Sequence, residues 1–390
     1  MNEGESRHVA GLWLFTRFRR YCAFGHHRKL ILRSGTNHHM AGKFDIYGIG
    51  DLNVDYIVGR TSRAALEQAF PAKFRQLRAR FSSDRDRTAS REQIAEVLDL
   101  SRGFNVACLG GSAFNVIQAA AALKPELRLG CLGILASRQN RVADFAAWFD
   151  RHNVDRTYVL PVSGEQGSCV SLFESGKRLL LPHPATNGKA ADLFGERGDS
   201  IVEHIGDSRI IHLTPLIDER GADLAMRWMR AIKARNPELL LSLDPGYRWT
   251  ESIPPALAGL YKLVDVLFLN ETELRQLAAC HKQQPCKSII QGLLHRRVID
   301  APVTVAVKAD RNSYVYACDG GTVNESVHPI EAWLTEQQIE DTTGAGDVFA
   351  AGFLFGRFVQ GLTLQASIDL AHRLMWRKLQ GIGAPMTEVS

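Results

Sequence analysis

Short apolar runs alternate with amphipathic stretches along most of this chain. The runs carry few charges, which favours β-strands buried on both faces, because a strand covered on one face alternates apolar and polar positions. The runs predict strands at Phe44–Ile49, Val106–Leu109, Leu127–Leu132, Tyr158–Leu160, Cys169–Phe173, Arg209–Leu213, Leu239–Leu243, Asp265–Leu269, Val303–Val307 and Tyr314–Ala317.

The stretches between these runs repeat their apolar positions with the period of a helix. They predict helices at Arg63–Arg80, Arg91–Leu98, Ser112–Leu123, Arg141–His152, Arg220–Lys233, from Glu271 onward, Ala345–Val359 and Leu364–Leu379. Strands that alternate with helices indicate an α/β fold, doubly wound around a mostly parallel sheet. We expect one large domain over residues 44–390, in which segments 56–105 and 158–181 break the rhythm and form a small β lid.

Positive charge is concentrated at the N-terminus. Residues 1–43 hold eight Lys or Arg and two Asp or Glu, whereas the rest of the chain holds 39 Lys or Arg and 40 Asp or Glu. We expect this arm to be a disordered leader, although its Arg-rich composition is also similar to that of an organelle transit peptide. The neutral body lacks the basic footprint of a nucleic-acid-binding domain, so a nucleic-acid or membrane-surface binder is supported only by the basic arm and the basic stretch Arg63–Arg91.

Hydropathy and cysteine content indicate the compartment. The chain has no apolar run of about 18 residues, the length needed to span a membrane. Its seven cysteines are odd in number and include no CxxC pair. We therefore expect reduced thiols in a cytoplasmic protein and no membrane partner.

The most specific motif is the segment DTTGAGD, from Asp341 to Asp347, which leads into an amphipathic helix. A helix that starts within this segment presents unpaired amide groups and the positive end of its dipole. Gly344 and Gly346 allow a phosphate to approach that backbone closely. Asp347 would lie in the first turn, where a carboxylate can accept the proton of an attacking hydroxyl group. The alternative is a capped helix with flexible glycines and no ligand.

This motif resembles that of the ribokinase (PfkB) family of carbohydrate kinases, which includes adenosine kinases. The resemblance extends over residues 44–385 and implies a ribokinase-like fold with Asp347 as the catalytic base. It places an anion hole at the amides of Gly344, Ala345 and Gly346. It also places Asp341 and Thr343 where many members hold a monovalent cation.

Two further segments are similar to the acceptor-binding motifs of that family. In GIGDLNVD, Asp55 and its companion Asn53 correspond to residues that bind substrate hydroxyls, and a carboxylate can accept two such hydrogen bonds. A dinucleotide-binding GxGxxG motif is excluded because Asn53 stands where the third Gly is needed. In GGSAFN, the resemblance assigns acceptor contacts to Gly110, Gly111 and Asn115. Turn capping by Asp55 and simple packing of the two glycines are the alternatives.

Three segments would face the nucleotide or an anionic group. In NETE, Asn270 and Glu273 lie one helical turn apart, and an acid there can orient Mg²⁺ through water, although a cluster of acids at a helix start is the alternative. In DPGYRW, Arg248 could bind a carboxylate or phosphate, or the motif could be only a turn. The resemblance adds Lys308 and Thr342, but Asp310 and Ser313 replace two glycines of the family's nucleotide loop.

We therefore expect a kinase that uses ATP and Mg²⁺, with K⁺ as a further cofactor that the resemblance allows. Its acceptor would be a hydroxyl of a sugar or sugar-like molecule. The alternatives are a nucleoside kinase, which the long insertion at Arg63–Leu98 and the residues Ser112 and Phe114 favour, and a non-catalytic ligand-binding relative. The resemblance also allows a homodimer through the lid.

Overall fold

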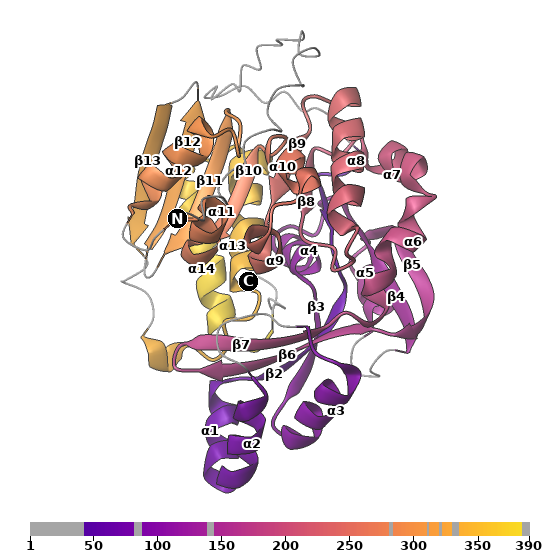
Figure 1. Ribbon diagram of the computed structural model, residues 1–390, viewed down its shortest axis with the longest axis vertical. Coiled ribbons are helices and arrows are strands. Elements are labelled where there is room, and N and C mark those ends of the chain that lie inside the picture. Colours follow the sequence, from indigo (N-terminus) through magenta and orange to yellow (C-terminus); the bar gives the residue numbers. More distant parts are fainter. Residues whose placement is uncertain are drawn as a thin grey trace, which may run out of the picture. The chain divides into compact units, whose positions relative to one another are not determined.

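The computed structural model describes residues 43–81, 88–138, 144–280, 284–309, 312–319, 322–329 and 335–383. The basic arm, apart from Lys43, and Asp310 therefore lie outside the described residues. The remaining elements form two sheets with their helices (Figure 1).

The larger sheet contains nine strands in the order β13-β12-β11-β10-β9-β8-β1-β4-β5. All neighbours from β11 to β5 are parallel, and β12 and β13 add an antiparallel hairpin at one edge. The strands are β1 (Ile46–Ile49), β4 (Leu129–Arg138), β5 (Asp155–Glu165), β8 (Ile210–Leu213), β9 (Leu240–Leu243), β10 (Val266–Asn270), β11 (Val303–Ala309), β12 (Asn312–Asp319) and β13 (Thr322–Pro329).

Helices cover both faces of this sheet, as the short apolar runs predicted. Side chains of one group pack with the first sheet face: α6 (Ala190–Gly195), α7 (Gly198–Ile205), α8 (Gly221–Arg235), α9 (Gly246–Glu251), α10 (Pro255–Tyr261), α11 (Glu271–Ala278) and α12 (Cys286–His295). The second face packs against α4 (Ser112–Leu123), α5 (Phe145–Arg151), α13 (Ala345–Leu354) and α14 (Leu364–Leu379). The doubly wound α/β prediction is thus confirmed.

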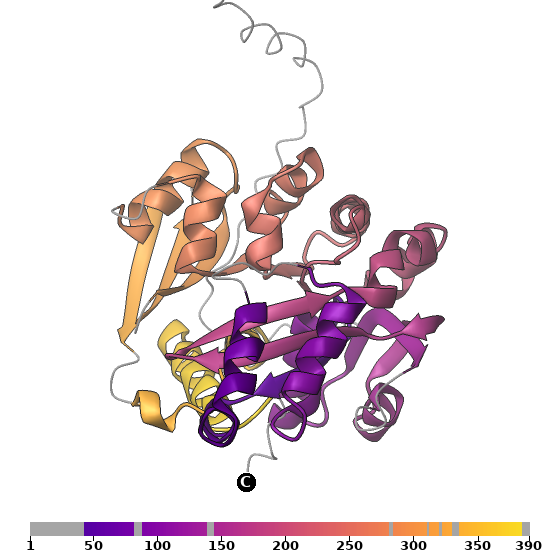
Figure 2. The same cartoon turned by 60° about the horizontal axis from the view of Figure 1, so that its bottom comes forward.

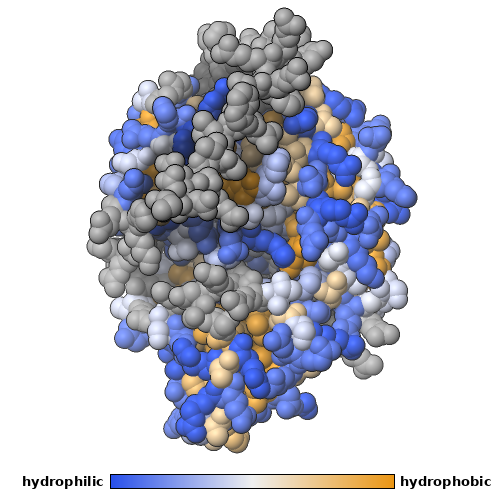
Figure 3. All heavy atoms as spheres, viewed as in Figure 1, coloured by the Kyte–Doolittle hydropathy of each residue, from blue (hydrophilic) through white to orange (hydrophobic). Residues whose placement is uncertain are grey.

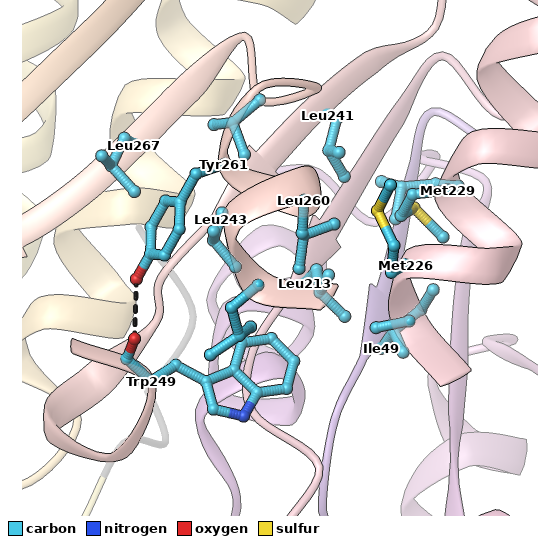
Figure 4. Close-up of a cluster of buried hydrophobic side chains, with 14 of the residues drawn as sticks. Ile49, Leu213, Met226, Met229, Leu241, Leu243, Trp249, Leu260, Tyr261 and Leu267 are labelled. Atoms are coloured by element: carbon cyan, nitrogen blue, oxygen red, sulfur yellow. Dashed lines mark hydrogen bonds between the residues drawn. The ribbon is translucent and has the colours of Figure 1, made fainter. Parts of the chain in front are cut away.

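A buried tyrosine orders the first of these two cores. The hydroxyl of Tyr261 donates to the backbone carbonyl of Trp249 at 3.0 Å, so its polar end is satisfied inside the apolar cluster (Figure 4). Leu213, Leu243 and Leu267, from three neighbouring strands, line the same cluster. This packing fixes α9 and α10 close to the end of β9.

The smaller sheet is the predicted lid. Its strand order is β3-β2-β6-β7, with β2 (Asn53–Val58), β3 (Val106–Gly110), β6 (Gly167–Glu174) and β7 (Lys177–His183). Three helices cover its outer face (Figure 2): α1 (Arg60–Ala69), α2 (Pro71–Arg80) and α3 (Arg91–Leu100). Their apolar side chains pack with Val58, Val170 and Leu172. Polar and apolar residues are interspersed on the surface of this region (Figure 3).

The structure corrects several predicted boundaries. The helix expected at Arg63–Arg80 is two helices, because Pro71 starts a new one and leaves Phe70 outside helical geometry. Strand β5, which contains Tyr158–Leu160, pairs with β4 in the large sheet and does not belong to the lid. The helix expected at Ala345–Val359 is α-helical only to Leu354 and continues as a π-helical turn, Phe355–Val359. Short 3-10 turns lie at Ala185–Lys189 and Glu336–Gln338.

Three findings concern the described residues only. No helix there is long and apolar enough to cross a membrane. The cysteines there are all free: Cys108, Cys131, Cys169, Cys280, Cys286 and Cys318. No cluster of three or more His, Cys, Asp or Glu side chains in that part of the chain is arranged to hold a metal ion.

Candidate active site

The turn before α13 has the geometry that the sequence predicted. Gly344 adopts φ 75°, a left-handed conformation that favours glycine, and the helix starts at the next residue. Gly346 is exposed, and a Cβ atom there would meet no other atom within 4 Å, so open space lies beside this backbone. The amide of Ala345 donates to the carbonyl of Thr342 at a long 3.3 Å. A ligand would have to compete with that bond for one of the three expected amides.

Asp347 lies in the first turn of α13 and is buried, with 8% of its surface exposed. The Nδ2 group of Asn115, on α4, donates to its Oδ2 atom at 2.8 Å. Burial raises the pKa of Asp347, and the hydrogen bond from Asn115 and the charge of Arg178 lower it. The Oδ1 atom of Asn115 is buried and has no hydrogen-bond partner among the described residues. The pair therefore presents a proton acceptor next to an unused hydrogen-bond acceptor.

Asp55 lies on the inner side of the lid, on strand β2. Its pKa is raised to about 7, mainly by burial and also by the nearby charges of Asp347 and Asp341, against the lowering effect of Arg178. Its carboxylate occupies the space above Gly110, where a Cβ atom would lie 2.1 Å from Oδ2. The first glycine of GGSAFN is thus required by the position of Asp55. The two predicted acids, Asp55 and Asp347, share one electrostatic environment.

The second glycine of that motif has a structural reason of its own. Gly111 has φ 114°, and a Cβ atom there would lie 2.0 Å from the carbonyl oxygen of Asp51. Only glycine fits where the loop after β1 crosses the start of α4. Asp51 itself accepts a hydrogen bond from the amide of Ile217 at 2.9 Å. The pKa of Asp51 is raised to about 7 by burial, against the lowering effects of the Ile217 hydrogen bond and of the positive charge of Arg248. Arg248, on α9, is exposed, and its charge reaches Asp51.

Asn53 is held by a residue that the sequence did not single out. The Nδ2 group of Asn187 donates to Oδ1 of Asn53 at 2.9 Å and to the carbonyl of Leu52 at 2.9 Å. The Oδ1 atom of Asn187 is buried, and the described residues provide no partner for it. Asn187 lies in an irregular 3-10 turn with no motif, so only tertiary structure shows its proximity to the site.

Arg178, on lid strand β7, was also missed. Its charge lowers the pKa of Asp55, Asp244 and Asp347, which lie on three different elements. The charge of this exposed guanidinium group therefore reaches all three buried or partly buried acids. On the sequence, Arg178 is one basic residue of the segment 158–181 that was expected to join the lid, which most often means only a solvated side chain.

The NETE segment was expected either to orient Mg²⁺ or only to place acids at a helix start, and the structure has features of both. Asn270 and Glu273 form a capping box: the amide of Glu273 donates to Asn270 Oδ1 at 2.9 Å, and the amide of Asn270 donates to Glu273 Oε2 at 2.8 Å. The charge of Glu273 also raises the pKa of Asp244, after burial, to well above its usual range. Concentrated negative charge of this kind fits a hydrated divalent cation.

The segment that resembles the family's nucleotide loop contains one expected cation and one unexpected hydrogen bond. Desolvation and the like charges of Arg178 and Lys378 together lower the pKa of Lys308 to about 8, although this residue is partly exposed. Ser313 is buried, and its hydroxyl lies 2.8 Å from Nε2 of His372 on α14. The serine that replaces a family glycine thus joins β12 to α14.

Asp341 is buried and fully engaged. The Nζ group of Lys378 donates to its carbonyl oxygen at 2.6 Å and to its Oδ2 atom at 3.0 Å. The amide of Thr343 donates to Oδ1 at 2.9 Å and the amide of Gly383 to Oδ2 at 3.1 Å. The Thr343 hydroxyl lies 3.0 Å from that of Ser171 on the lid. Of the predicted residues, Asp341 and Thr343 therefore bind protein groups directly.

The chain is similar to known proteins in sequence and in fold. The family model described as pfkB family carbohydrate kinase matches residues 89–384. An adenosine kinase from Schizophyllum commune is 23% identical over 286 residues, 70% of this chain and 80% of that protein. An uncharacterized sugar kinase from Archaeoglobus fulgidus is 24% identical over 238 residues, 60% of this chain and 85% of that protein. The crystal structure of adenosine kinase from Sinorhizobium meliloti superposes with a TM-score of 0.67 at 20% identity, covering 89% of this chain and 97% of that one.

Proposed function

Since the chain belongs to the PfkB family of carbohydrate kinases, we propose that it transfers the γ-phosphoryl group of ATP to a hydroxyl group of a sugar or sugar-like small molecule, with Asp347 as the general base. The chain is a phosphotransferase with an alcohol group as acceptor, and its fold is ribokinase-like.

The observation that carries the proposal is the environment of Asp347. A buried carboxylate in the first turn of α13 lies one residue after Gly346, whose backbone borders open space. The start of a helix stabilises the negative charge of a phosphoryl group, and an adjacent carboxylate can accept the proton of the attacking hydroxyl. Both functions are therefore provided by the same turn. The raised pKa of Asp347 suits this role, because a base with a pKa nearer neutrality holds the abstracted proton better.

The step follows from these positions. Asp347 takes the proton of the acceptor hydroxyl as its oxygen attacks the γ-phosphorus, and the bond from that phosphorus to the bridging oxygen of ADP breaks. The backbone at Gly344–Gly346 and the side chains of Arg178 and Lys308 stabilise the negative charge in transit. When bound, Mg²⁺ would be held through water by Asp244 and Glu273 and would neutralise the phosphates. Asp55, Asn53 and the Oδ1 atoms of Asn115 and Asn187 orient the acceptor.

A nucleoside acceptor is the second candidate. The three helices that cover the lid come from the insertion that favoured this alternative on the sequence, and two of the proteins similar to this chain are named adenosine kinases. Both candidates share the ribose-like polyol that Asp55 and its neighbours would bind. The two acceptors differ in the group attached to that polyol, which is a base in a nucleoside.

The proposal is tested by ATP turnover with purified protein. Free pentoses, hexoses, sugar acids and nucleosides are supplied one at a time with Mg-ATP, and acceptor phosphorylation is followed by mass. The Asp347→Asn variant is the control for adventitious kinase. Phosphorylation of one acceptor class by the native chain and not by the variant supports the proposal. ATP and acceptor binding without turnover would instead indicate the non-catalytic relative.

A further inference from the structure

The ion pair between Asp341 and Lys378 lies at the start of the catalytic turn. The Lys378 side chain has 0% of its surface exposed and the Asp341 side chain 1%. The Nζ group contacts two atoms of Asp341, the carbonyl oxygen and Oδ2. Lys378 comes from the last turn of α14, so the contact joins the C-terminal helix to the segment that leads into α13.

These contacts decide whether Asp341 fits a monovalent metal cation, which the family resemblance placed beside it. Such an ion is bound by a ring of oxygen atoms that replaces its hydration shell. Here the carbonyl oxygen and Oδ2 are directed at an ammonium group, and the amides of Thr343 and Gly383 donate to the carboxylate. The partners of Asp341 are therefore hydrogen-bond donors. They do not fit a metal ion at this position.

We infer that the ammonium group of Lys378 is a built-in cation that takes the place of a monovalent metal ion beside the catalytic turn. An ammonium group supplies one positive charge and directional donors, and it is tethered to α14, so it is present at any salt composition. Its charge reaches the site, because it lowers the pKa of Asp347 and of Lys308. Lys378 is thus a positioning residue for the segment 341–344, and turnover is independent of the monovalent cation in solution.

A second buried lysine provides a matched control. Lys233, on α8, donates to the carbonyl of Leu239 at 2.5 Å and pairs with the carboxylate of Asp265. The chemistry is the same, a buried ammonium group on one carbonyl and one carboxylate, but α8 packs on the opposite face of the sheet from α13 and α14. Truncation of Lys233 should cost stability without affecting the catalytic turn.

The inference rests on the proposed kinase reaction for its activity readout, so the test also measures thermal unfolding. The native chain, Lys378→Ala and Lys233→Ala are compared in chloride salts of potassium, ammonium, sodium and tetramethylammonium at constant ionic strength. We expect native turnover to vary by less than about twofold among the salts. Both variants should lose several degrees of Tm, but only Lys378→Ala should also lose turnover. Ammonium or potassium should restore its turnover and its Tm, because these ions enter the vacated space beside the catalytic turn.

Two outcomes would overturn the inference. One is stimulation of the native chain by about tenfold or more in potassium relative to tetramethylammonium. The other is an equal response of the two alanine variants to the salts. If Lys378→Ala does not fold, Lys378→Arg replaces it and the native salt series still decides. If no acceptor is phosphorylated, the kinase proposal fails while the Tm series continues to test the cation.

Discussion

The side-chain amide of Asn115 lies 2.8 Å from the carboxylate of Asp347, although 232 positions separate the two residues in the chain. The contact joins the first turn of α4 to the first turn of α13, so both helix starts face the same point. The hydrogen bond stabilises the ionised form of Asp347 against the effect of burial. It makes the base available at a lower pH than burial alone would allow.

Replacing the base should separate chemistry from folding. We expect Asp347→Asn to lower kcat by roughly 10²–10⁴, the usual contribution of a general base, with little change in Kd for ATP. The free energy of unfolding should be unchanged or slightly larger, because the variant removes a buried charge. Retention of more than half of the native kcat would contradict the role.

The hydrogen bond from Asn115 should be visible in the pH profile. Its loss in Asn115→Ala removes an effect that lowers the pKa of Asp347, so that pKa rises further. Because the base acts in its ionised form, the ascending limb of kcat against pH should move to higher pH. Asn187→Ala is the control, since Asn187 contacts Asn53 and not Asp347. A limb that stays in place in both variants would show that Asn115 does not tune the base.

Asp55 should reduce stability while it promotes acceptor binding. Its pKa is about 7 in the folded chain and near 3.8 when unfolded, so the folded state holds its proton over a wider pH range. The free energy of unfolding therefore falls as pH rises from about 4 to 7. Asp55→Asn should escape this loss and be more stable than the native chain at pH 8, by up to roughly 4 kcal/mol. The KM for the acceptor should rise roughly 10- to 150-fold, the effect of losing hydrogen bonds to a charged group.

A partly buried acid outside the candidate site, Asp45, gives the control for this result. Asp45 is paired with Arg128 at 2.9 Å, and although burial raises its pKa, the contacts with Arg128 bring it below the usual value. Asp45→Asn should therefore lose stability at neutral pH and leave both KM values unchanged. Chemical denaturation at pH 5 and pH 8 measures both variants. A loss of stability in Asp55→Asn with an unchanged acceptor KM would indicate that Asp55 only caps a turn.

Arg178 should act on the phosphoryl group more than on the fold. We expect Arg178→Gln to lower kcat/KM for ATP by about 10²-fold or more, because one charge-assisted contact to a phosphate is lost. Arg78→Gln is the matched control, since Arg78 is an arginine whose ion pair with Glu174, at 2.5 Å, ties α2 to β6. Similar kinetics in the two variants would place Arg178 outside the reaction.

The sequence predicted the parts of the site that have a local cause. The boundaries of α4 at Ser112–Leu123 and of α14 at Leu364–Leu379 were predicted to the residue. The local cause for α4 is an alanine-rich stretch that directly follows two glycines. The DTTGAGD turn was recognisable because glycines and acids at that spacing have few other uses. The break at Pro71 could also have been predicted, since proline favours the first turn of a helix.

The residues that were missed share a different cause. Arg178, Asn187 and Lys378 lie on a strand, an irregular turn and a helix whose local sequences carry no motif. Each is defined by what the fold places opposite it: three acids, Asn53 and Asp341 respectively. Such long-range pairings cannot be predicted from a periodic pattern, because the pattern of one sequence does not say which distant residues lie together.

The helices α1, α2 and α3 make the lid a small two-layered body with an interior of its own. One side of its sheet carries Asp55 toward the site, and the other buries Val58, Val170 and Leu172 under these helices. A second molecule that approached the lid from outside would meet helices and not bare strands. A chain shortened by the removal of residues 60–100 would expose that apolar strand face to water. The exposed strand face would then be buried by aggregation or by association with a second copy of the shortened chain.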